Sequence, residues 1–241
     1  MIIIPDVHGR TFWKEAVNKA ARNEKIIFLG DYLDPYSWEK HLDKDVIHNF
    51  EEIIEFKKQN KDRCVLLLGN HDCEYFIQTT PCRYMYKYAD KIKSLFEKNI
   101  TLFKLIHIEQ IHNKIYAFSH APILKSWITS VAFNWKIFNV SDDILRISNV
   151  INILLHSNYS SLKDLLNMIG FQRGGYCDTP SVIWCDVREI SNQEQFANVY
   201  EIFGHTQLTK EIISNNWACL DCRKAFSLNE QTLNITPITS E

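Results

Sequence analysis

Five short polar clusters, each placed directly after a strand-like apolar run, constrain this chain more than any other feature of its sequence. They are Asp6-Val7-His8-Gly9, Gly30-Asp31-Tyr32-Leu33-Asp34, Gly69-Asn70-His71-Asp72, Ser119-His120-Ala121 and Gly204-His205-Thr206. In open α/β sheets, the loops at the carboxyl ends of the strands converge on one crevice. We therefore predict that the acidic, amide and imidazole side chains of these clusters meet at one site.

The first part of the chain alternates between strand-like and helix-like segments. Apolar runs at 2–5, 26–29 and 65–68 have the length and composition of buried strands. Segments 11–22 and 45–58 have helical character, and in the second of these the apolar residues recur on one face of a helix. The order strand, helix, strand, helix, strand predicts a parallel βαβαβ unit.

Further strand-like runs follow on both sides of a helix-rich middle. Strands are predicted at 102–108, 114–119, 181–185, 199–203, 217–220 and 225–228. The middle runs from about Ser141 to Met168, with Ser141 as the expected N-cap. The fold class that follows is α/β (α+β), with a parallel start, a mixed or antiparallel second half, and helices that cover the sheet faces.

The domain organisation follows from length and composition. The chain has 241 residues, of which 46% are hydrophobic, and it shows no internal repeat, low-complexity stretch or interdomain linker. We predict one domain over residues 1–241. A helical segment at about 122–170 is expected to lie near the cleft.

Charge and composition exclude several classes of function. The formal net charge of −2 provides no basic field for coating nucleic acid or an acidic membrane surface. Apolar runs such as 26–29 and 65–68 cover four residues, far fewer than the roughly 20 of a membrane-spanning helix, and no export leader is visible. Seven cysteines without framework spacing favour a reducing compartment. We expect a cytoplasmic protein.

The donor atoms of the clusters indicate metal chemistry. Asp, His and Asn offer oxygen and imidazole ligands, which suit manganese, iron or zinc and require no thiolate. A single Asp or His after a strand is ordinarily a turn or capping residue, so the argument depends on all five clusters together. The isolated Cys219-Leu220-Asp221-Cys222 is given no role, and Trp184 is expected to pack in the core.

The clusters, in this order, resemble the calcineurin-like metallophosphoesterase superfamily, whose pattern is D-x-H, G-D-x-x-D, G-N-H-[DE], H and G-H. The match spans positions 6 to 206. The stretch Phe28-Leu29-Gly30-Asp31-Tyr32-Leu33-Asp34 is most similar to the phosphoprotein (Ser/Thr) phosphatases and the related bis(5′-nucleosyl)-tetraphosphatases. The resemblance implies a sandwich of two mixed β-sheets flanked by helices.

The resemblance also implies a role for each matching residue. Two divalent metal ions are expected, with manganese as the first choice and iron or zinc as alternatives. The implied ligands are Asp6 and His8 for one ion, Asn70, His120 and His205 for the other, and Asp31 as the bridge. His71 would be the general acid that protonates the leaving group. Asp34 would orient His71 and raise its pKa.

Three positions depart from the pattern. Pro35 stands where the phosphoprotein phosphatases have an arginine that grips the substrate phosphate. Gln207 stands where many other branches have a second histidine of the first metal site, so weaker binding of the first ion is expected. Asp72 replaces the glutamate of the eukaryotic phosphatases and indicates a bacterial-type branch.

A guanidinium must replace the one lost at Pro35, because a transferring phosphoryl group spreads negative charge over three oxygens. Arg173, which precedes Gly174-Gly175, is the first candidate. Arg10 is the second candidate and Arg83 the third.

The predicted function is a binuclear metal-dependent phosphoesterase that hydrolyses phosphate esters by attack of a metal-bound hydroxide. Its first form is a Ser/Thr-protein-phosphatase-like phosphomonoesterase. The alternative is a dinucleoside polyphosphate (tetraphosphatase-like) hydrolase or another phosphodiesterase, and a non-catalytic scaffold of the same fold is the third possibility. The expected partner is a phosphorylated substrate, either a phosphoprotein or a nucleotide. The sequence leaves the oligomeric state open.

Overall fold

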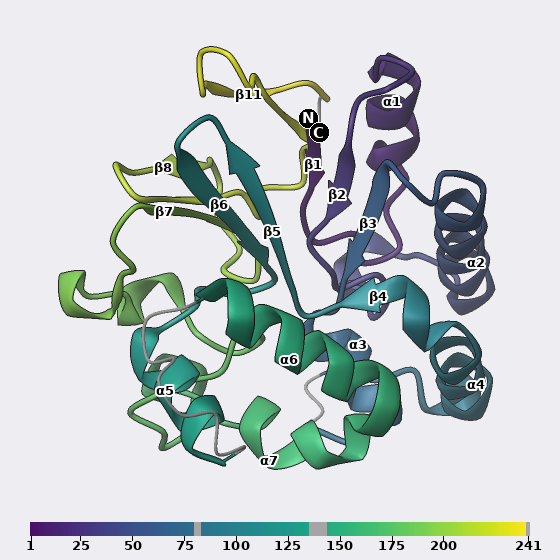
Figure 1. The fold of residues 1–241 in the computed structure, drawn as a ribbon. Helices are drawn as coiled ribbons and strands as arrows, with labels where there is room; N and C mark the ends of the chain where they lie inside the picture. The colour runs from purple at the N-terminus through teal and green to yellow at the C-terminus, as the bar shows by residue number, and fades with distance from the viewer. Residues whose placement is uncertain (80–82, 135–143, 240–241) are drawn as a thin grey trace.

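The computed structural model describes residues 1–79, 83–134 and 144–239 (Figure 1). Its helices are α1 (Phe12–Lys19), α2 (Asp43–Gln59), α3 (Asn70–Phe76), α4 (Ala89–Asn99), α5 (Lys125–Asn134), α6 (Ile144–Asn158) and α7 (Lys163–Leu166). Its strands are β1 (Ile2–Ile4), β2 (Ile26–Phe28), β3 (Cys64–Leu67), β4 (Phe103–Lys104), β5 (Ile106–Ile111), β6 (Lys114–Ser119), β7 (Val199–Phe203), β8 (Ile212–Ile213), β9 (Trp217–Cys219), β10 (Phe226–Leu228) and β11 (Ile235–Pro237).

The strands of the described residues form two mixed sheets. The first has the order β11-β10-β1-β2-β3-β4, and the second has the order β5-β6-β7-β9-β8. β1, β2 and β3 pair in parallel, with Ile2 opposite Ile26 and Ile26 opposite Cys64, whereas β1 pairs antiparallel with β10. The parallel βαβαβ start, the mixed second half and the fold class are therefore confirmed.

The three parallel strands are apolar on both faces because each face meets a different core. Along β1, Ile2 and Ile4 belong to the core beneath the helices, while Ile3 belongs to the core between the two sheets. The same alternation recurs in β2, where Phe28 points to the helices and Ile27 to the other sheet. Since side chains alternate between the faces of a strand, an uninterrupted apolar run fits a strand buried on both sides.

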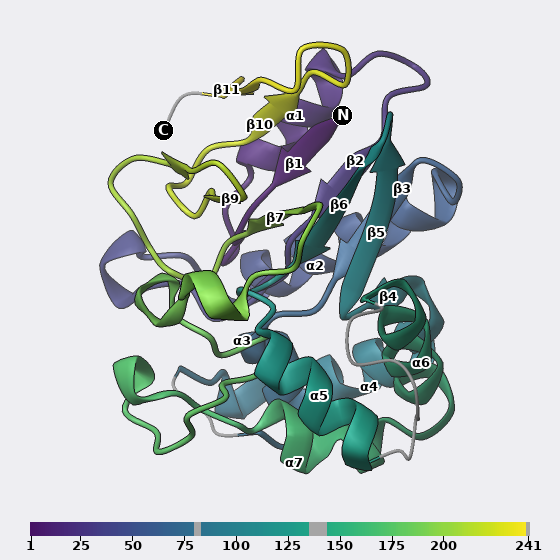
Figure 2. The ribbon, with the colours of Figure 1, turned by 60° about the vertical axis from the view of Figure 1, so that its left-hand side comes forward.

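Helices flank the sandwich and also close one of its ends. α1, α2 and α4 cover the outer face of the first sheet, while α5, α6 and α7 lie at the end of the molecule where α3 begins (Figures 1 and 2). The side chain of Asn152 in α6 fixes this end, because it accepts a hydrogen bond from Leu105 N at 2.9 Å and donates one to Ile106 O at 2.8 Å.

Two of the predicted strands, 181–185 and 102–108, do not form with the predicted bounds. Segment 181–185 is a buried turn, in which the backbone N–H groups of Trp184 and Cys185 both donate to Ser181 O at 2.9 Å. Segment 102–108 is divided at Leu105, whose N–H bonds to the Asn152 side chain instead of continuing a ladder. An apolar run in the sequence indicates that the segment is buried. Whether the segment forms a strand depends on whether another strand lies beside it to pair with.

The helix-rich middle also differs in detail. A 3₁₀ turn at Tyr159–Leu162 divides it into α6 and α7, and the predicted N-cap Ser141 lies outside the described residues. That this segment shapes the mouth of the cleft stays a prediction, as does the single domain over 1–241.

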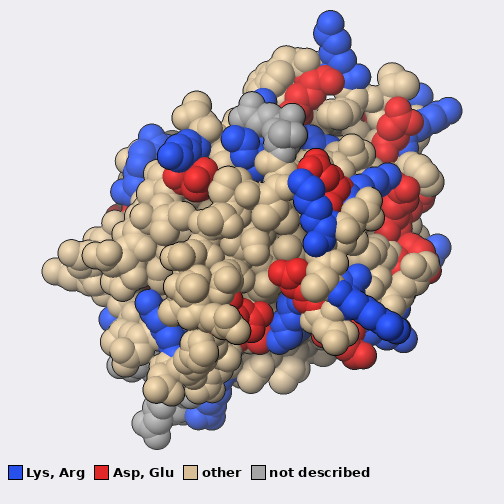
Figure 3. Space-filling view, turned by 90° about the horizontal axis from the view of Figure 1, so that it is seen from above, with Lys and Arg blue, Asp and Glu red and all other residues tan. Residues whose placement is uncertain are grey.

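The described residues contain no helix that is long and apolar enough to cross a bilayer. On the face seen from above in Figure 3, lysine and arginine side chains are interspersed with aspartate and glutamate. That face shows no large field of one sign, in agreement with the small net charge of the chain.

Candidate active site

The structure brings the five polar clusters to the carboxyl ends of their strands. Asp6 and His8 follow β1, Asp31 and Asp34 follow β2, Asn70 and His71 open α3 directly after β3, His120 follows β6, and His205 follows β7. All eight residues are buried, at 8% exposure or less. The predicted convergence of these side chains is therefore present.

Four of these residues have a left-handed backbone. His8, Asp31, Asp34 and His205 have φ angles of 44°, 52°, 56° and 64°. Non-glycine residues rarely adopt positive φ, and such strain is tolerated where the surrounding structure over-determines it, often at functional sites. The sharp turn at each strand end places the side chain in the crevice instead of along the strand.

Two glycines allow carboxylates to approach the backbone closely. A Cβ at Gly69 would overlap the carboxylate of Asp31, and a Cβ at Gly204 would overlap the carboxylate of Asp6. In the same place, both Asp6 oxygens lie 3.1 Å from His205 N, which donates to them. Gly69 and Gly204 are therefore required by the position of these two acidic groups.

Asn70, His120 and His205, here called the second half of the site, aim three donor atoms at one point. His120 Nδ1 donates to Leu29 O at 2.9 Å, so in the neutral ring Nε2 carries a lone pair. That Nε2 lies 3.0 Å from Asn70 Oδ1 and 3.1 Å from His205 Nδ1. Two ligand atoms bound to one ion at about 2.1 Å each stand roughly 3 Å apart, so this spacing fits a shared cation.

Asp6 and His8, here called the first half, are arranged in a similar way. His8 Nδ1 donates to Leu33 O at 2.7 Å, which leaves the Nε2 lone pair facing Asp31 Oδ2 at 3.5 Å. One carboxylate oxygen each of Asp6 and Asp31 and one nitrogen of His120 lie within 4.8 Å of one another. The two halves are therefore contiguous.

Asp31 lies between the two halves. Its Oδ2 is 3.5 Å from His8 Nε2 and also 3.5 Å from His120 Nε2, while Oδ1 accepts the backbone N–H of His71 at 3.0 Å. One carboxylate oxygen thus faces a lone pair from each half. This is the geometry that a bridging ligand needs.

The electrostatics of the site also fit cations. Burial lowers the pKa values of His8 and His205 well below the usual range, so both rings are neutral, as metal ligands must be. Burial raises the pKa of Asp6. Burial and the nearby Asp6 carboxylate raise the pKa of Asp221, a further acidic group at the site. Divalent ions would relieve this concentration of buried negative charge.

The ring of His205 presents Nδ1 to the other donors, 3.1 Å from His120 Nε2. The residues that would hold two divalent ions are Asp6, His8, Asp31, Asn70, His120 and His205.

His71 and Asp34 form a pair beside the donor set. His71 Nδ1 lies 3.0 Å from Asp34 Oδ2, and Tyr75 donates its hydroxyl to Asp34 Oδ1 at 2.5 Å. Burial raises the pKa of Asp34, while the hydrogen bonds from His71 and Tyr75 lower it. With both oxygens engaged, Asp34 fixes the orientation of the imidazole.

Asp72 joins the two loops that carry these groups. Its carboxylate accepts backbone N–H groups from Asp31 at 2.7 Å, Tyr32 at 3.0 Å and Gly69 at 2.8 Å. Burial and the Asp31 carboxylate raise its pKa, whereas the three backbone donors lower it. Asp72 therefore sets the separation between the Asp31 loop and the start of α3.

A sequence profile described as calcineurin-like phosphoesterase matches residues 1–207. The chain belongs to this family. As a member it is a metal-dependent phosphoesterase, a hydrolase that uses divalent ions and acts on phosphorylated substrates. The resemblance stated from the five clusters is thereby confirmed.

Solved structures show the same fold. A cold-active protein-tyrosine phosphatase of a psychrophilic Shewanella species has a TM-score of 0.56 and 15% identity, with 98% of this chain and 79% of that chain covered. A protein serine/threonine phosphatase from Saccharomyces cerevisiae has a TM-score of 0.52 and 14% identity, with 91% and 65% covered. At these identities the likeness concerns the fold alone. A search of curated protein sequences finds no match.

Two of the arginines predicted for this phosphoesterase have protein partners. Arg173 Nε lies 2.9 Å from Asp186 Oδ2, and its Nη2 donates to His205 O at 3.0 Å and to Thr206 Oγ1 at 3.1 Å. Arg173 therefore supports the loop that carries His205. That it also contacts a substrate phosphate stays a prediction.

Arg10 lies beside the first half. Its Nε donates to Glu39 Oε1 at 2.7 Å, and Nη1 donates to Asp6 O at 3.2 Å. Part of its charge is thus neutralised by the half-buried carboxylate of Glu39. Its predicted contact with phosphate likewise stays a prediction.

Several site residues of the phosphoesterase were missed at the level of sequence. Asp221 follows β9 as the other acids follow their strands, so the rule that found them applies to it as well. Tyr75 lies one helical turn after His71, a spacing that predicts a shared face of α3. Trp184 is buried as expected, but its ring also packs edge-on against His205 at 5.9 Å.

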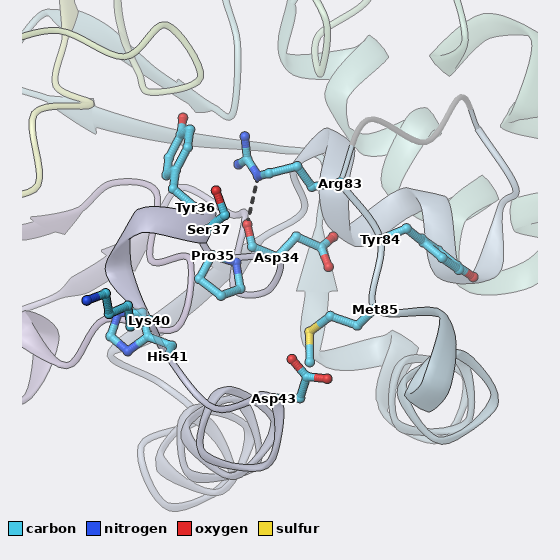
Figure 4. Close-up of a pocket in the computed structure, with 10 residues that line it drawn as sticks. All are labelled: Asp34, Pro35, Tyr36, Ser37, Lys40, His41, Asp43, Arg83, Tyr84 and Met85. Atoms are coloured by element: carbon cyan, nitrogen blue, oxygen red, sulfur yellow. Dashed lines mark hydrogen bonds between the residues drawn. The ribbon is translucent and has the colours of Figure 1, made fainter.

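A pocket of about 190 Å³ adjoins the His71–Asp34 pair (Figure 4). It is lined by Asp34, Pro35, Tyr36, Ser37, Lys40, His41, Asp43, Arg83, Tyr84 and Met85. Two of these residues, Asp34 and Arg83, also contact side chains of the candidate centre. The pocket therefore lies next to the group that would serve the leaving oxygen.

Proposed function

We propose that this phosphoesterase is a phosphomonoesterase of the Ser/Thr-protein-phosphatase type, which acts on phosphorylated side chains of proteins. The observation that carries the proposal is the His71–Asp34 pair at 3.0 Å, beside six convergent metal-binding side chains. The adjoining pocket of about 190 Å³ supports this substrate class, because it suits one amino-acid side chain.

The division of labour follows from the contacts. Two divalent ions, when bound, supply Lewis acidity that polarises the phosphoryl group and lowers the pKa of water. Asp34 holds the Nδ1 proton of His71, which leaves Nε2 to carry the proton that the departing alkoxide requires. Tyr75 and the left-handed turn at Asp34 keep that carboxylate in place.

A second candidate is a dinucleoside polyphosphate hydrolase or another phosphodiesterase. The observation that favours it is an aromatic pair near the site, in which Tyr36 stacks on Trp38 with ring centroids 4.3 Å apart. The Trp38 side chain is 59% exposed and would offer a face to a nucleobase.

The finer assignments belong to the same proposal. Manganese remains the first choice of ion, with iron and zinc as alternatives, because the donors are carboxylate, amide and imidazole groups. The described cysteines are free thiols, which supports the proposed cytoplasmic location. The binding partner is a phosphoprotein in the first form and a nucleotide in the second.

The test measures leaving-group dependence with manganese present. For His71→Asn we expect kcat to fall roughly 100-fold or more with phenyl phosphate, and less with p-nitrophenyl phosphate, whose leaving group needs less protonation. The control is His112→Asn, at an exposed histidine outside the five clusters. Equal losses with both esters, together with loss of a bound manganese, would make His71 a ligand, which its proximity to His8 and Asp31 allows.

Substrate class is tested separately. We expect a phosphoserine peptide to be hydrolysed with a kcat/KM at least tenfold above that for bis(p-nitrophenyl) phosphate and for a dinucleoside tetraphosphate. The reverse order would establish the second candidate, and a Trp38→Ala variant would then lower kcat/KM for the nucleotide alone. No turnover with any of these substrates and any first-row metal would refute both.

A further inference from the structure

Arg83 is an arginine of the site that no described carboxylate neutralises. Within the described residues, no Asp or Glu oxygen forms an ion pair with its guanidinium, whereas Arg10 pairs with Glu39 and Arg173 with Asp186. Arg83 reaches the site from the segment between α3 and α4, 48 positions along the chain from Pro35. It therefore offers a positive charge at a place where the sequence lacks the expected one.

Two contacts hold the guanidinium in a fixed orientation. Nε donates to Asp34 O at 3.0 Å, and Cζ lies 3.9 Å from the centroid of the Tyr36 ring (Figure 4). The other face of Tyr36 is covered by Trp38, so the ring itself has little freedom to turn. A planar cation stacked on a fixed ring is pre-organised for bidentate contact with an oxyanion.

The free end of Arg83 points at the first half. Its Nη2 lies 3.3 Å from His8 Nε2, the lone-pair nitrogen that faces Asp31. If His8 held a cation, that lone pair would be occupied and the N–H group of Arg83 would need another acceptor. An oxyanion beside the cation would provide one.

We propose that Arg83 binds the substrate phosphate over the first half, in place of the arginine that Pro35 displaces, with Tyr36 as its positioning residue. The inference rests on the proposed function, since it assigns a contact with the same substrate. It differs from the sequence-based order of candidates, in which Arg173 came first.

The test measures oxyanion binding and metal binding separately, with no turnover required. Inorganic phosphate is titrated into the manganese-loaded protein by calorimetry, and manganese is titrated into the metal-free protein and followed by electron paramagnetic resonance. For Arg83→Ala we expect phosphate affinity to fall at least tenfold, and manganese affinity to stay the same or rise, because a positive charge beside His8 is removed. Arg22→Ala, at an exposed arginine on the surface, is the control and should change neither affinity.

Two further variants guard against a folding defect. Arg83→Lys keeps the charge but loses the stacked fork, so we expect a smaller loss of phosphate affinity than in Arg83→Ala. Tyr36→Leu keeps Arg83 itself and should weaken phosphate binding a few-fold while leaving manganese binding unchanged. This pattern supports positioning, because a general loss of structure would weaken both ligands.

The inference is overturned if Arg83→Ala binds phosphate within about twofold of the wild type, or if it loses manganese and phosphate together. The second result would make Arg83 a structural support. Neither result touches the proposed function, which fails on a different measurement, the absence of turnover by the wild-type protein. A tenfold loss in Arg173→Ala with none in Arg83→Ala would restore the order of candidates drawn from sequence.

Discussion

The two halves of the candidate metal centre differ in the number and the support of their candidate donors. The second half has Asn70, His120 and His205, supplied from three different strand ends, whereas the first half has only Asp6 and His8, both from the loop after β1. Gln207, where many relatives place a further histidine, is exposed. We infer that the second half holds its ion more tightly, and that the first half is the more open to exchange and to substrate.

The largest expected effect comes from the residue that both halves share. Asp31→Asn keeps the size of the side chain, keeps an oxygen for His71 N, and tolerates the left-handed φ of 52°. It removes the charge that faces His8 and His120. We expect kcat/KM to fall by at least about 10³-fold and both manganese affinities to drop.

Equilibrium dialysis with manganese checks the stoichiometry, and p-nitrophenyl phosphate checks the rate. If the variant still retains two ions at wild-type affinity, Asp31 is not the bridge and the division into halves has to be redrawn.

A matched pair of substitutions separates the halves. We expect His120→Asn to abolish the tighter of two manganese-binding steps and His8→Asn to abolish the weaker one, with kcat/KM reduced roughly 100-fold in each. The two imidazoles have equivalent second contacts, Leu29 O at 2.9 Å and Leu33 O at 2.7 Å, so the comparison is between like environments. Calorimetric titration resolves the steps, and the opposite assignment would invert the proposed order of affinity.

The part of the site that could be predicted from sequence is the part that local chemistry dictates. The Asp, His and Gly residues after β1, β2 and β3 are required by sharp turns at strand ends, and those turns have a sequence signature. The alternation of Ile2, Ile3 and Ile4 between two cores likewise follows from strand geometry alone. These features need no knowledge of which distant segment packs where.

The features that escaped prediction depend on distant packing. Segment 181–185 is as apolar as a strand, yet its backbone hydrogen bonds close a turn because no strand pairs with it. Arg83 was ranked last because nothing next to it in the sequence shows that its guanidinium reaches Tyr36 and His8. Asp221 was missed because the approach of its carboxyl group to Asp6 depends on how the loop after β9 packs against the loop after β1.

A smaller effect on kcat/KM is expected from a change at Asp72, which joins the Asp31 loop to the start of α3. Asp72→Asn leaves an amide N–H₂ facing backbone N–H donors of Asp31, Tyr32 or Gly69, so about 2–3 kcal/mol of folding stability should be lost. We expect kcat/KM to fall about tenfold, because Asp31 and the start of α3 shift together. Urea unfolding measures the stability, and Asp72→Glu, the residue of the eukaryotic phosphatases, is the control that retains the charge. Loss of one manganese alone would show that Asp72 supports a single half.

The smallest expected effect on hydrolysis comes from a residue behind the second half. Glu201 in β7 accepts Ile123 N at 2.9 Å and so ties the turn after His120 to the strand that leads to His205. Burial raises its pKa to about 8. An unfolded glutamate ionises near pH 4.5, so between pH 4.5 and 8 the folded state binds more protons than the unfolded state. Stability therefore falls as the pH rises through this range and stays low above it.

Glu201→Gln removes this ionisation and keeps an oxygen for Ile123 N. At pH 5 the two proteins should have nearly equal free energies of unfolding, whereas at pH 9 the variant should be more stable by about 2 kcal/mol or more. Urea unfolding at the two pH values measures the difference, and kcat at pH 7 should change less than twofold. We also expect the tighter manganese-binding step to weaken between pH 7 and 9 in the wild type but not in Glu201→Gln, because ionised Glu201 would disturb the support of the second half. If only the weaker binding step changes, the contact between Glu201 and Ile123 supports the first half instead. That result would contradict the inference that the second half is the better supported of the two.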